Sequence, residues 1–231
     1  MFRYQYNVFL IINFMEEDKS SRDHNILKGY NMLLYFAGSM IMYEPSEECV
    51  VDFWRNGILK KLPVSSSNPN FIKASSQLRE SCADQRLCGA ELREDYNRLF
   101  SKDTFPLAPA FETLYPDCRQ LSSVSTFAEV SEFYTSYGWQ SKLKGKIPDD
   151  HLGMELLFLT TMVEKYTVMD DPACRIEMRR EIRRYLDNHI LSWVPSWNDK
   201  MQIYSHTLCY KAIGTLIYAC SQDIYGILLK Q

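Results

Sequence analysis

Apolar residues recur at steps of three and four along most of this chain of 231 residues. After Pro148, for example, they fall at Leu152, Leu156, Leu159 and Val163, which together make one face of a helix. A period of two, the mark of a half-buried strand, nowhere reaches the length of a strand. The pattern therefore predicts an all-α protein.

Prolines, glycines and capping residues set the bounds of several predicted helices. The first covers the apolar stripe at 26–41 and ends before Pro45, and Ser46 with two following glutamates begins a short second one. A capping box at Thr126 begins a helix that Gly138 ends. The other expected helices are a weak one after the connection at 63–70, a firmer one from about 85 to 100, one opened by Asp171 and Pro172 that runs to 190, and a last apolar one from about 204 to 229.

The string PDDHLGMELLFL, which begins at Pro148, places carboxylates and an imidazole where a loop meets a helix. Asp149 or Asp150 is expected to cap this helix by accepting its free amides. His151 then lies in the first turn, where the helix dipole disfavours its protonated form unless Asp150 or Glu155 offsets that effect. A plain helix cap is one interpretation of this string, and a functional junction is the other.

The segment 139–148 is basic, has no clear period and separates two sets of helices. We expect it to be a hinge within a single domain, 1–231, between an N-terminal lobe at 21–138 and a C-terminal lobe at 149–231. Residues 1–20 are expected to be a poorly ordered extension. Because a hinge of this kind lets the C-terminal helices exchange between two copies, we expect a monomer that also forms a domain-swapped dimer.

The composition is that of an ordinary soluble protein, with 46% hydrophobic and 24% charged residues. A net charge of -3 and a pI near 5.9 leave no basic field that would hold nucleic acid or an anionic membrane. The nearest approach to a membrane span, at 8–12, is far shorter than the roughly 18 to 20 residues that a span requires. We therefore expect no nucleic-acid binding, no stable membrane insertion and a cytoplasmic location.

The motifs of metal, phosphate and serine chemistry are missing. Seven cysteines stand singly without a CxxC pair, which fits unpaired, buried thiols in a reducing compartment rather than a zinc site. The histidines at 24, 151, 189 and 206 belong to no HExxH motif, and the sequence has no P-loop, no GxGxxG and no GxSxG. We therefore expect no metal and no cofactor.

Four segments carry a recognisable combination of residues. DYNRLF at 95–100 ends a helix with an aromatic-x-x-Leu-Phe pattern, and LAPAFETLYPD at 107–117 is a proline loop followed by an aromatic residue, a glutamate and a tyrosine. IPDDHLGMELLFL follows at 147–159, and HILSWVPSW at 189–197 reads as a turn before the last helix. In order and spacing, these segments resemble the TorD family of redox enzyme maturation chaperones.

Ten residues match the family's motifs, and the resemblance implies that they bind a peptide. They are Tyr96, Leu99, Phe100, Pro109, Phe111, Glu112, Tyr115, Pro148, Asp150 and His151. Thr113 stands where the family usually has serine, and Ile147 where it usually has glutamate, which removes one carboxylate from the loop. Upstream of about residue 85 the likeness is limited to helical pattern and size.

The resemblance implies a single domain of about nine helices in two lobes, without catalytic residues or a cofactor, that acts as a chaperone. Such a chaperone binds the twin-arginine signal peptide, the apo form, or both, of a molybdenum-cofactor oxidoreductase until the cofactor is inserted, before export. The residues are compatible, because two guanidinium groups followed by an apolar run require carboxylates beside an apolar groove. Between 90 and 160 the chain has eleven acidic and seven basic residues, so this segment is its acidic part.

Two other functions remain open. The first is an assembly factor that holds the body of a non-exported, nitrate-reductase-type subunit. The second is a small helical hydrolase that uses Asp150 and His151, for which no second histidine–aspartate set is evident. His189 and His206 have no neighbouring carboxylate beyond Asp187, and His189 is expected to be a half-buried helix residue.

Overall fold

The computed structural model describes residues 19–50, 61–81, 88–101, 105–115 and 126–230. The expected N-terminal extension at 1–20 lies outside these ranges except for its last two residues. The helical elements are α1 (Lys19–Met42), α2 (Glu47–Val50), α3 (Pro69–Glu80), α4 (Cys88–Phe100), the 3-10 turn η4 (Glu112–Leu114), α5 (Thr126–Ser136), α6 (Leu152–Thr167), α7 (Pro172–Tyr185), the π-helical turn η5 (Leu186–Ile190), α8 (Val194–Tyr204) and α9 (Leu208–Lys230). Within the described ranges there is no strand, so the prediction of an all-α protein is confirmed.

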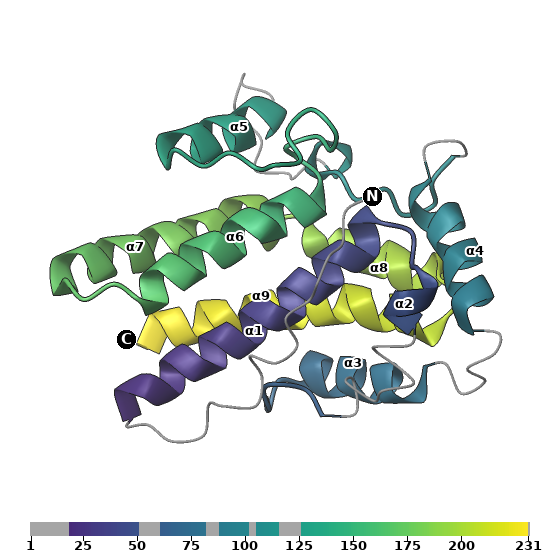
Figure 1. Cartoon of the computed structure of the whole chain (residues 1–231), viewed down its shortest axis with the longest axis horizontal. Helices are drawn as coiled ribbons and strands as arrows, with labels where there is room; N and C mark the ends of the chain where they lie inside the picture. The colour runs from purple at the N-terminus through teal and green to yellow at the C-terminus, as the bar shows by residue number, and fades with distance from the viewer. Residues whose placement is uncertain (1–18, 51–60, 82–87, 102–104, 116–125, 231) are drawn as a thin grey trace.

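The last helix, α9, forms the centre of the fold. It packs against α1, α3 and α8, and Figure 1 shows α1 and α9 crossing the middle of the molecule with α3 on one side and α6 and α7 on the other. This position explains its composition, because a helix covered on several sides is apolar around most of its circumference. Tyr210, near its start, is fully buried and donates its hydroxyl to the carbonyl oxygen of Met40 at 3.2 Å.

By length and mean hydropathy alone, α9 could also cross a membrane, contrary to the expectation that no segment comes near that length. Its most apolar stretch has a mean hydropathy of 1.3, and 61% of that stretch is buried inside the protein. The neighbouring helices thus already cover most of the surface that lipid would cover. The long apolar sequence of α9 is accounted for by its place in the core.

The helices α1 and α6 cross at close range where Gly153 of α6 meets α1. A β-carbon built on Gly153 would lie 2.2 Å from Cγ of Met42 and 3.2 Å from the carbonyl oxygen of Gly38. Real β-carbons essentially never lie as close as 2.2 Å to another atom, and 3.2 Å is a tight contact, so the spacing of the two helices depends on the missing side chain of Gly153.

Helices from both predicted lobes share one core. The pairs α1 with α6 and α3 with α9 each join an N-terminal to a C-terminal element. The segment 139–148 contains turns but no regular helix, and its first residue, Trp139, packs edge to face on Tyr134 at 4.7 Å and on Phe158 at 5.2 Å between ring centroids. The division into lobes and the role of this segment as a hinge stay predictions.

Several local expectations need correction. His151, and not an aspartate, caps α6, because its ring nitrogen Nδ1 accepts the backbone N–H of Gly153 at 3.0 Å. The segment that was expected to be a turn before the last helix instead contains α8, which starts with a proline in its first turn. The helix expected to run to residue 190 changes to a π-helical turn after Tyr185.

The cysteines also differ in part from expectation. Cys174 is free and exposed, and Cys209 and Cys220 are free and buried. Cys88, however, is disulfide-bonded, so the prediction of unpaired thiols is wrong at that position.

The contact between α1 and α6 can be tested by replacing Gly153 with alanine. We expect Gly153→Ala to lower the free energy of unfolding by about 1 to 3 kcal/mol, because the added methyl group overlaps Met42 and the backbone of α1. Gly226→Ala in α9 is the control, since nothing lies within 4 Å of the added atom. It should stabilise by roughly 0.5 to 1 kcal/mol through helix propensity. Urea unfolding would contradict the interpretation if both variants gained stability.

Candidate functional site

The proline loop and the start of α6 are joined through their backbones. The N–H of Glu112 donates to the carbonyl oxygen of Asp150 at 2.9 Å, and the N–H of Leu152 donates to that of Ala110 at 2.9 Å. Phe111 and His151 are therefore paired in an isolated antiparallel bridge, with their rings edge to face at 5.1 Å between centroids. Two of the four motif segments thus form one structural unit.

Asp150 and His151 both have structural partners within this unit. The Asp150 side chain is buried and accepts the hydroxyl of Thr113 at 2.7 Å through Oδ2. His151 is also buried and uses Nδ1 to cap α6. Thr113, which stands where the family usually has serine, still supplies the hydroxyl that bonds Asp150. The proline loop therefore orients the carboxylate of Asp150.

Glu112 is buried below the loop and pairs with His189 of η5, the π-helical turn that follows α7. Its Oε2 atom is 3.2 Å from Nδ1 of His189, and each side chain is 6% exposed. The π-helical turn η5 positions this ring, and the carbonyl oxygen of His189 accepts the indole N–H of Trp193 at 2.7 Å. The expectation that His189 is half-buried is therefore wrong, because it is buried, and the fold brings to it the carboxylate of Glu112, which is not its neighbour in sequence.

Glu155 is a second acid in the same buried region. It is fully buried in α6, and among the described residues neither of its carboxyl oxygens has a hydrogen-bond partner. Burial first, and then the nearby charges of Glu112 and Asp150, raise the pKa of Glu155 well above its usual value. Burial also raises the pKa of Glu112, although His189 acts in the opposite direction. The folded chain thus favours a proton on this carboxyl pair.

The buried pair does not have the form of a hydrolytic site. Glu112 and His189 are almost closed to solvent, and Phe133 and Tyr185 cover the imidazole with ring centroids at 5.7 and 5.2 Å. Among the described residues, no group of three or more acidic, histidine or cysteine side chains is arranged to hold a metal ion. What the arrangement can do is hold the loop against α6 and η5 with buried polar groups.

Tyr115, at the end of the described part of the proline loop, packs against Trp193 and Lys200. Its ring stacks on Trp193 at 5.3 Å, and the ammonium group of Lys200 lies 4.6 Å from the ring centroid. Burial raises its pKa, and among the described residues its hydroxyl has no hydrogen-bond partner. Tyr115 is thus mainly a packing residue in this state of the protein.

The motif residues of α4 contact one another and the start of α9 rather than the bridged unit. Tyr96 and Phe100 are half-buried and contact each other edge to face at 5.4 Å, and Phe100 contacts Tyr210 at 5.6 Å. Leu99 is completely buried and therefore offers no surface to a ligand in this structure. Its carbonyl oxygen accepts the N–H of Ala108 at 3.1 Å, which joins α4 to the proline loop.

The structure thus places the predicted residues in two neighbouring groups. Phe111, Glu112, Tyr115, Asp150 and His151 belong to the bridged unit, flanked by the half-buried Pro109 and Pro148. The α4 group joins this unit through the backbone of the proline loop and through Trp197, whose indole N–H donates to the carbonyl oxygen of Ala108 at 3.1 Å. An apolar groove between the two lobes, near Asp150 and His151, stays a prediction; its expected lining is Tyr96, Leu99, Phe100, Phe111 and Tyr115.

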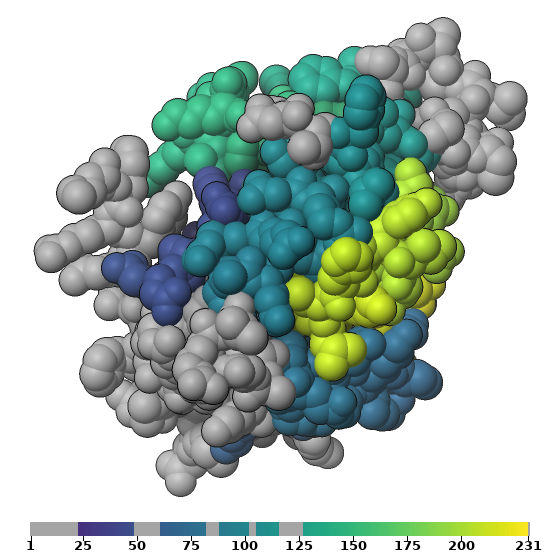
Figure 2. All heavy atoms as spheres, turned by 90° about the vertical axis from the view of Figure 1, so that its right-hand side faces the viewer, coloured from purple at the N-terminus to yellow at the C-terminus, as the bar shows by residue number. Residues whose placement is uncertain are grey.

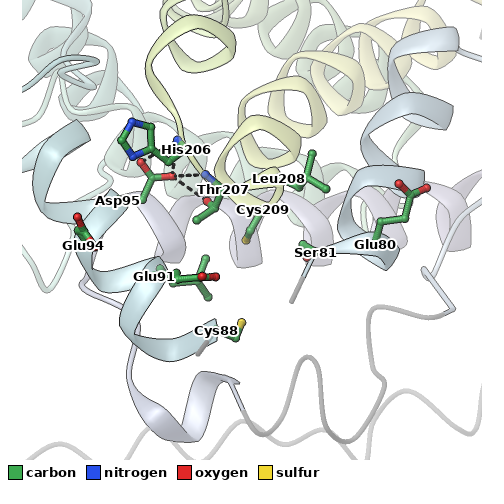
Figure 3. A pocket seen from close by; sticks show the side chains of 11 residues that line it. Glu80, Ser81, Cys88, Glu91, Glu94, Asp95, His206, Thr207, Leu208 and Cys209 are labelled. Atoms are coloured by element: carbon green, nitrogen blue, oxygen red, sulfur yellow. Dashed lines mark hydrogen bonds between the residues drawn. The ribbon is translucent and has the colours of Figure 1, made fainter. Parts of the chain in front are cut away.

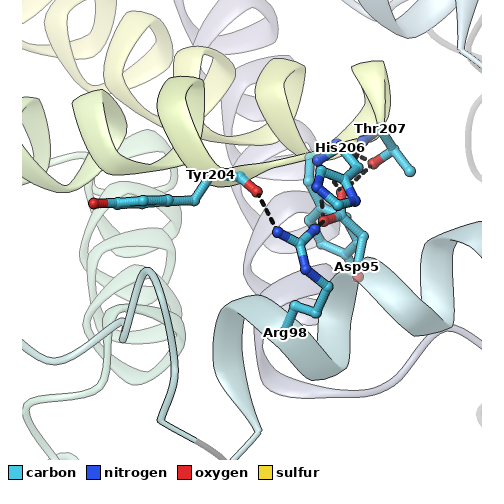
Figure 4. A network of polar contacts seen from close by, with 6 residues as sticks. Asp95, Arg98, Tyr204, His206 and Thr207 are labelled. Atoms are coloured by element: carbon cyan, nitrogen blue, oxygen red, sulfur yellow. Dashed lines mark hydrogen bonds and ion pairs between the residues drawn. The ribbon is translucent and has the colours of Figure 1, made fainter.

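Asp95, the first residue of the segment DYNRLF, forms a polar link that the sequence did not reveal (Figure 4). Its carboxylate is buried and accepts the backbone N–H groups of His206 and Thr207 at 3.0 and 2.8 Å and the Thr207 hydroxyl at 2.8 Å. Arg98 pairs with the same carboxylate at 3.2 Å and donates to the carbonyl oxygen of Tyr204 at 3.3 Å. Asp95 thereby fixes α4 to the turn between α8 and α9.

A cavity of about 530 Å³ lies next to this link, between α3, α4 and the start of α9 (Figure 3). Its volume is within the range of small ligand sites. The residues around it are Glu80, Ser81, Cys88, Glu91, Leu92, Glu94, Asp95, His206, Thr207, Leu208 and Cys209. Among the described residues of its walls, the acidic ones are Glu80 of α3 and Glu91, Glu94 and Asp95 of α4.

Sequence reasoning missed three functional candidates for one reason. Glu155, His189 and Asp95 gain their roles from partners on distant elements, which spacing along the chain does not show. Glu155 did carry a signal, because it is a single acid within the apolar run of α6 and had been considered only as a neighbour of His151.

Comparisons with known proteins place this geometry in context. A family model described as nitrate reductase delta subunit matches residues 67–199. A protein named chaperone protein TorD from Psychrobacter sp. (strain PRwf-1) is 27% identical over 134 residues, which are 58% of this chain and 60% of that protein. The chaperone protein TorD of Vibrio parahaemolyticus is 25% identical over 134 residues, 58% of this chain and 62% of the relative. The match thus spans only about 60% of the length of these relatives.

A third relative gives a longer match at lower identity. The protein named chaperone protein TorD from Vibrio cholerae is 19% identical over 198 residues, which cover 83% of this chain and 88% of the relative. The residues that the family model matches, 67–199, include the proline loop, the start of α6 and His189.

The buried acid of α6 predicts a pH dependence of stability. Because the pKa of Glu155 is raised on folding, the stability that its protonation contributes is complete at low pH and is lost as the pH rises toward the folded pKa. Glu155→Gln keeps the shape and removes the titration. We expect this variant to lose less stability than the unaltered protein between pH 5 and 8, by up to about 1.4 kcal/mol per pH unit.

Urea unfolding across this pH range measures the effect, and Glu164→Gln is the matched control. Glu164 lies on the same helix but is exposed, so its removal should leave the slope of stability against pH unchanged. Equal slopes for all three proteins would show that Glu155 does not titrate on folding in this range.

Proposed function

Because the chain belongs to the nitrate reductase delta subunit family, the TorD-like chaperones, we propose that it is a cytoplasmic chaperone for the maturation of a molybdenum-cofactor oxidoreductase. It acts by binding a client protein and not by catalysis. The description of the relatives as chaperones supports this role, and so does the solvent-excluded state of the Glu112–His189 pair.

The proposed client segment is a twin-arginine signal peptide. The observation that carries this proposal is the bridged unit itself, which joins Glu112 and Asp150 to each other and to Phe111 and Tyr115 through the backbone. Two guanidinium groups and an apolar run need this combination of partners. Since Asp150 is buried and bonded to Thr113, binding requires the guanidinium to replace the threonine hydroxyl as the partner of Asp150.

A second client contact is the body of an apo-subunit that is not exported. Two observations favour it. The matching family model is described as a nitrate reductase delta subunit, and the motif carboxylates are buried rather than presented on the surface. In that case the bridged unit shapes the fold, and the client is held by exposed surface elsewhere.

The proposal for the oligomeric state rests on the segment 139–148. It has no regular helix between α5 and α6, and most of its backbone hydrogen bonds are those of local turns. We propose a monomer that slowly exchanges with a domain-swapped dimer. Size-exclusion chromatography with light scattering on fresh and concentrated protein should show both species, and a strict monomer at every concentration would exclude the exchange.

The role of Asp150 in peptide binding is tested by calorimetry. A twin-arginine signal peptide should bind with a negative change in heat capacity, because its apolar run leaves water. Asp150→Ala should weaken binding roughly ten-fold or more, since a charge-assisted hydrogen bond contributes about 1.5 to 3 kcal/mol.

Thr113→Val is the matched variant, because it removes the competing hydroxyl and keeps the carboxylate. It should bind the peptide at least as tightly as the unaltered protein. If Asp150 is only structural, both variants lose about 1 kcal/mol of folding stability and neither changes the affinity. That result would remove Asp150 from the binding site.

A further inference from the structure

Two buried side chains hold the end of the proline loop, residues 110–115, against the rest of the protein. Glu112 pairs with His189 of η5, and Tyr115 stacks on Trp193. The two residues between these anchors are exposed. Figure 2 shows the face on which the teal residues, the loop among them, lie beside the yellow-green residues of α8. The segment is thus a short surface stretch whose attachment depends on the groups below it.

One group below the loop is a carboxyl without a fixed partner. Glu155 is fully buried, and neither of its oxygens makes a hydrogen bond of normal geometry with a described residue. Burial raises its pKa most, and the nearby charges of Glu112 and Asp150 raise it further. A protonated Glu155 is neutral and offers one O–H donor, whereas an ionised Glu155 adds a third negative charge at this place. Its protonation therefore changes the charge directly below the loop.

Uncharged groups surround Glu155 on several sides. The hydroxyls of Tyr134 in α5 and Tyr185 in α7 stay neutral, because burial raises the pKa of each well above its usual value. On the α1 side, Gly38 and Met42 meet α6 and carry no charge. These described neighbours supply no positive charge to an ionised Glu155.

The cationic groups that border this region are engaged elsewhere. His189 of η5 is paired with Glu112. Lys200 in α8 lies over the ring of Tyr115 at 4.6 Å, and Arg184 in α7 is paired with a glutamate of its own helix. The buried acid of α6 therefore has no ion pair with a described residue.

From this arrangement, we propose that Glu155 is a proton-dependent latch for the segment 110–115. While Glu155 carries a proton, the segment stays on α6 and η5. When the proton leaves, three carboxylates share one solvent-excluded place, and the segment moves outward so that Glu112 reaches water. Glu112 is the group that moves because it lies on a loop, whereas Asp150 and Glu155 belong to the start of α6.

The movement breaks only local contacts. It separates the two backbone hydrogen bonds of the bridge, the bond from Thr113 to Asp150 and the stack of Tyr115. The earlier part of the loop stays in place, because the N–H groups of Leu107 and Ala108 donate to α4 at 3.1 Å each. The segment therefore opens from residue 109 onward.

The latch deepens the proposed function, and its role in client binding rests on that function. Opening breaks the bond from Thr113 to Asp150 and frees this carboxylate for a client. Because closure raises the pKa of Glu155, closure is most stable at low pH and is weakened as the pH rises toward the pKa of the closed state. A client that needs the open segment should therefore bind more tightly at the higher pH.

Hydrogen exchange with mass spectrometry tests the latch on the whole protein without a client. Peptides that contain 110–115 are compared with peptides of α9 at pH 6 and pH 8, after correction for the intrinsic effect of pH on exchange. Protection of 110–115 should fall by up to about ten-fold per pH unit, the limit for the loss of one proton. Protection of α9 should stay well above it at both pH values, because α9 opens only in global unfolding. Equal protection in the two regions, or protection of 110–115 that is independent of pH, would overturn the latch.

Three variants assign the effect to one residue, and circular dichroism verifies that each is folded. Glu155→Gln keeps the volume and cannot ionise, so protection of 110–115 should be the same at both pH values. Glu112→Gln removes the carboxylate that moves and should reduce the pH dependence several-fold. Glu164→Gln, on the exposed side of α6, should keep the full dependence. A full dependence in Glu155→Gln would exclude Glu155, and if that variant does not fold, a full dependence in Glu112→Gln excludes the latch.

Calorimetry with a twin-arginine signal peptide separates the latch from the proposed function. Affinity that rises from pH 6 to pH 8 in the unaltered protein, but not in Glu155→Gln, would support control of the client site by the latch. Affinity that is independent of pH in a protein whose segment opens would overturn that control. A peptide that does not bind removes the proposed function and leaves the latch as measured by exchange. A peptide that binds although exchange shows no latch removes the latch alone.

Discussion

Two backbone hydrogen bonds between the proline loop and the start of α6 determine how the motif residues are arranged. They join Ala110 and Glu112 to Leu152 and Asp150, which lie in distant parts of the chain. Once this pairing forms, Thr113 reaches Asp150 and Phe111 covers His151. Because Glu112 belongs to the same loop, the pairing also fixes the position of the buried Glu112–His189 pair. The two backbone hydrogen bonds thus join two motif segments that are separate in the sequence.

The buried acids below the loop are the energetically demanding part of the protein. A carboxyl group without a hydrogen-bond partner costs free energy when it leaves water, and a charge costs more than a neutral acid. The chain limits this cost by protonation of Glu155 and by the pairing of Glu112 with His189. The surrounding aromatic rings, among them Phe133, Phe158 and Tyr185, supply the apolar burial that offsets the remainder.

Periodicity and capping residues sufficed to predict the all-α fold, because these signals are local. Asp171 caps α7 and Gly138 follows α5 with a positive φ of 60°, both as expected. The helix α8 was missed since Pro195 suggested a turn, although proline is also favourable in a first helical turn. The Glu112–His189 pair was not predictable, because the two residues are 77 positions apart and no spacing rule connects them.

The π-helical turn η5 has a consequence for which sequences can occupy this part of the chain. A π-helical turn contains one residue more than the α-helical turn it replaces, and one residue corresponds to about 100° of rotation. Deleting a residue such as the exposed Asn188 would therefore let η5 close to an ordinary α-helical turn, and the later side chains, including Trp193 and Trp197, would keep their orientation about the helix axis. What such a deletion removes is the widened turn that holds His189 beside Glu112. The extra residue of this turn thus serves the buried pair and not the continuation of the helix.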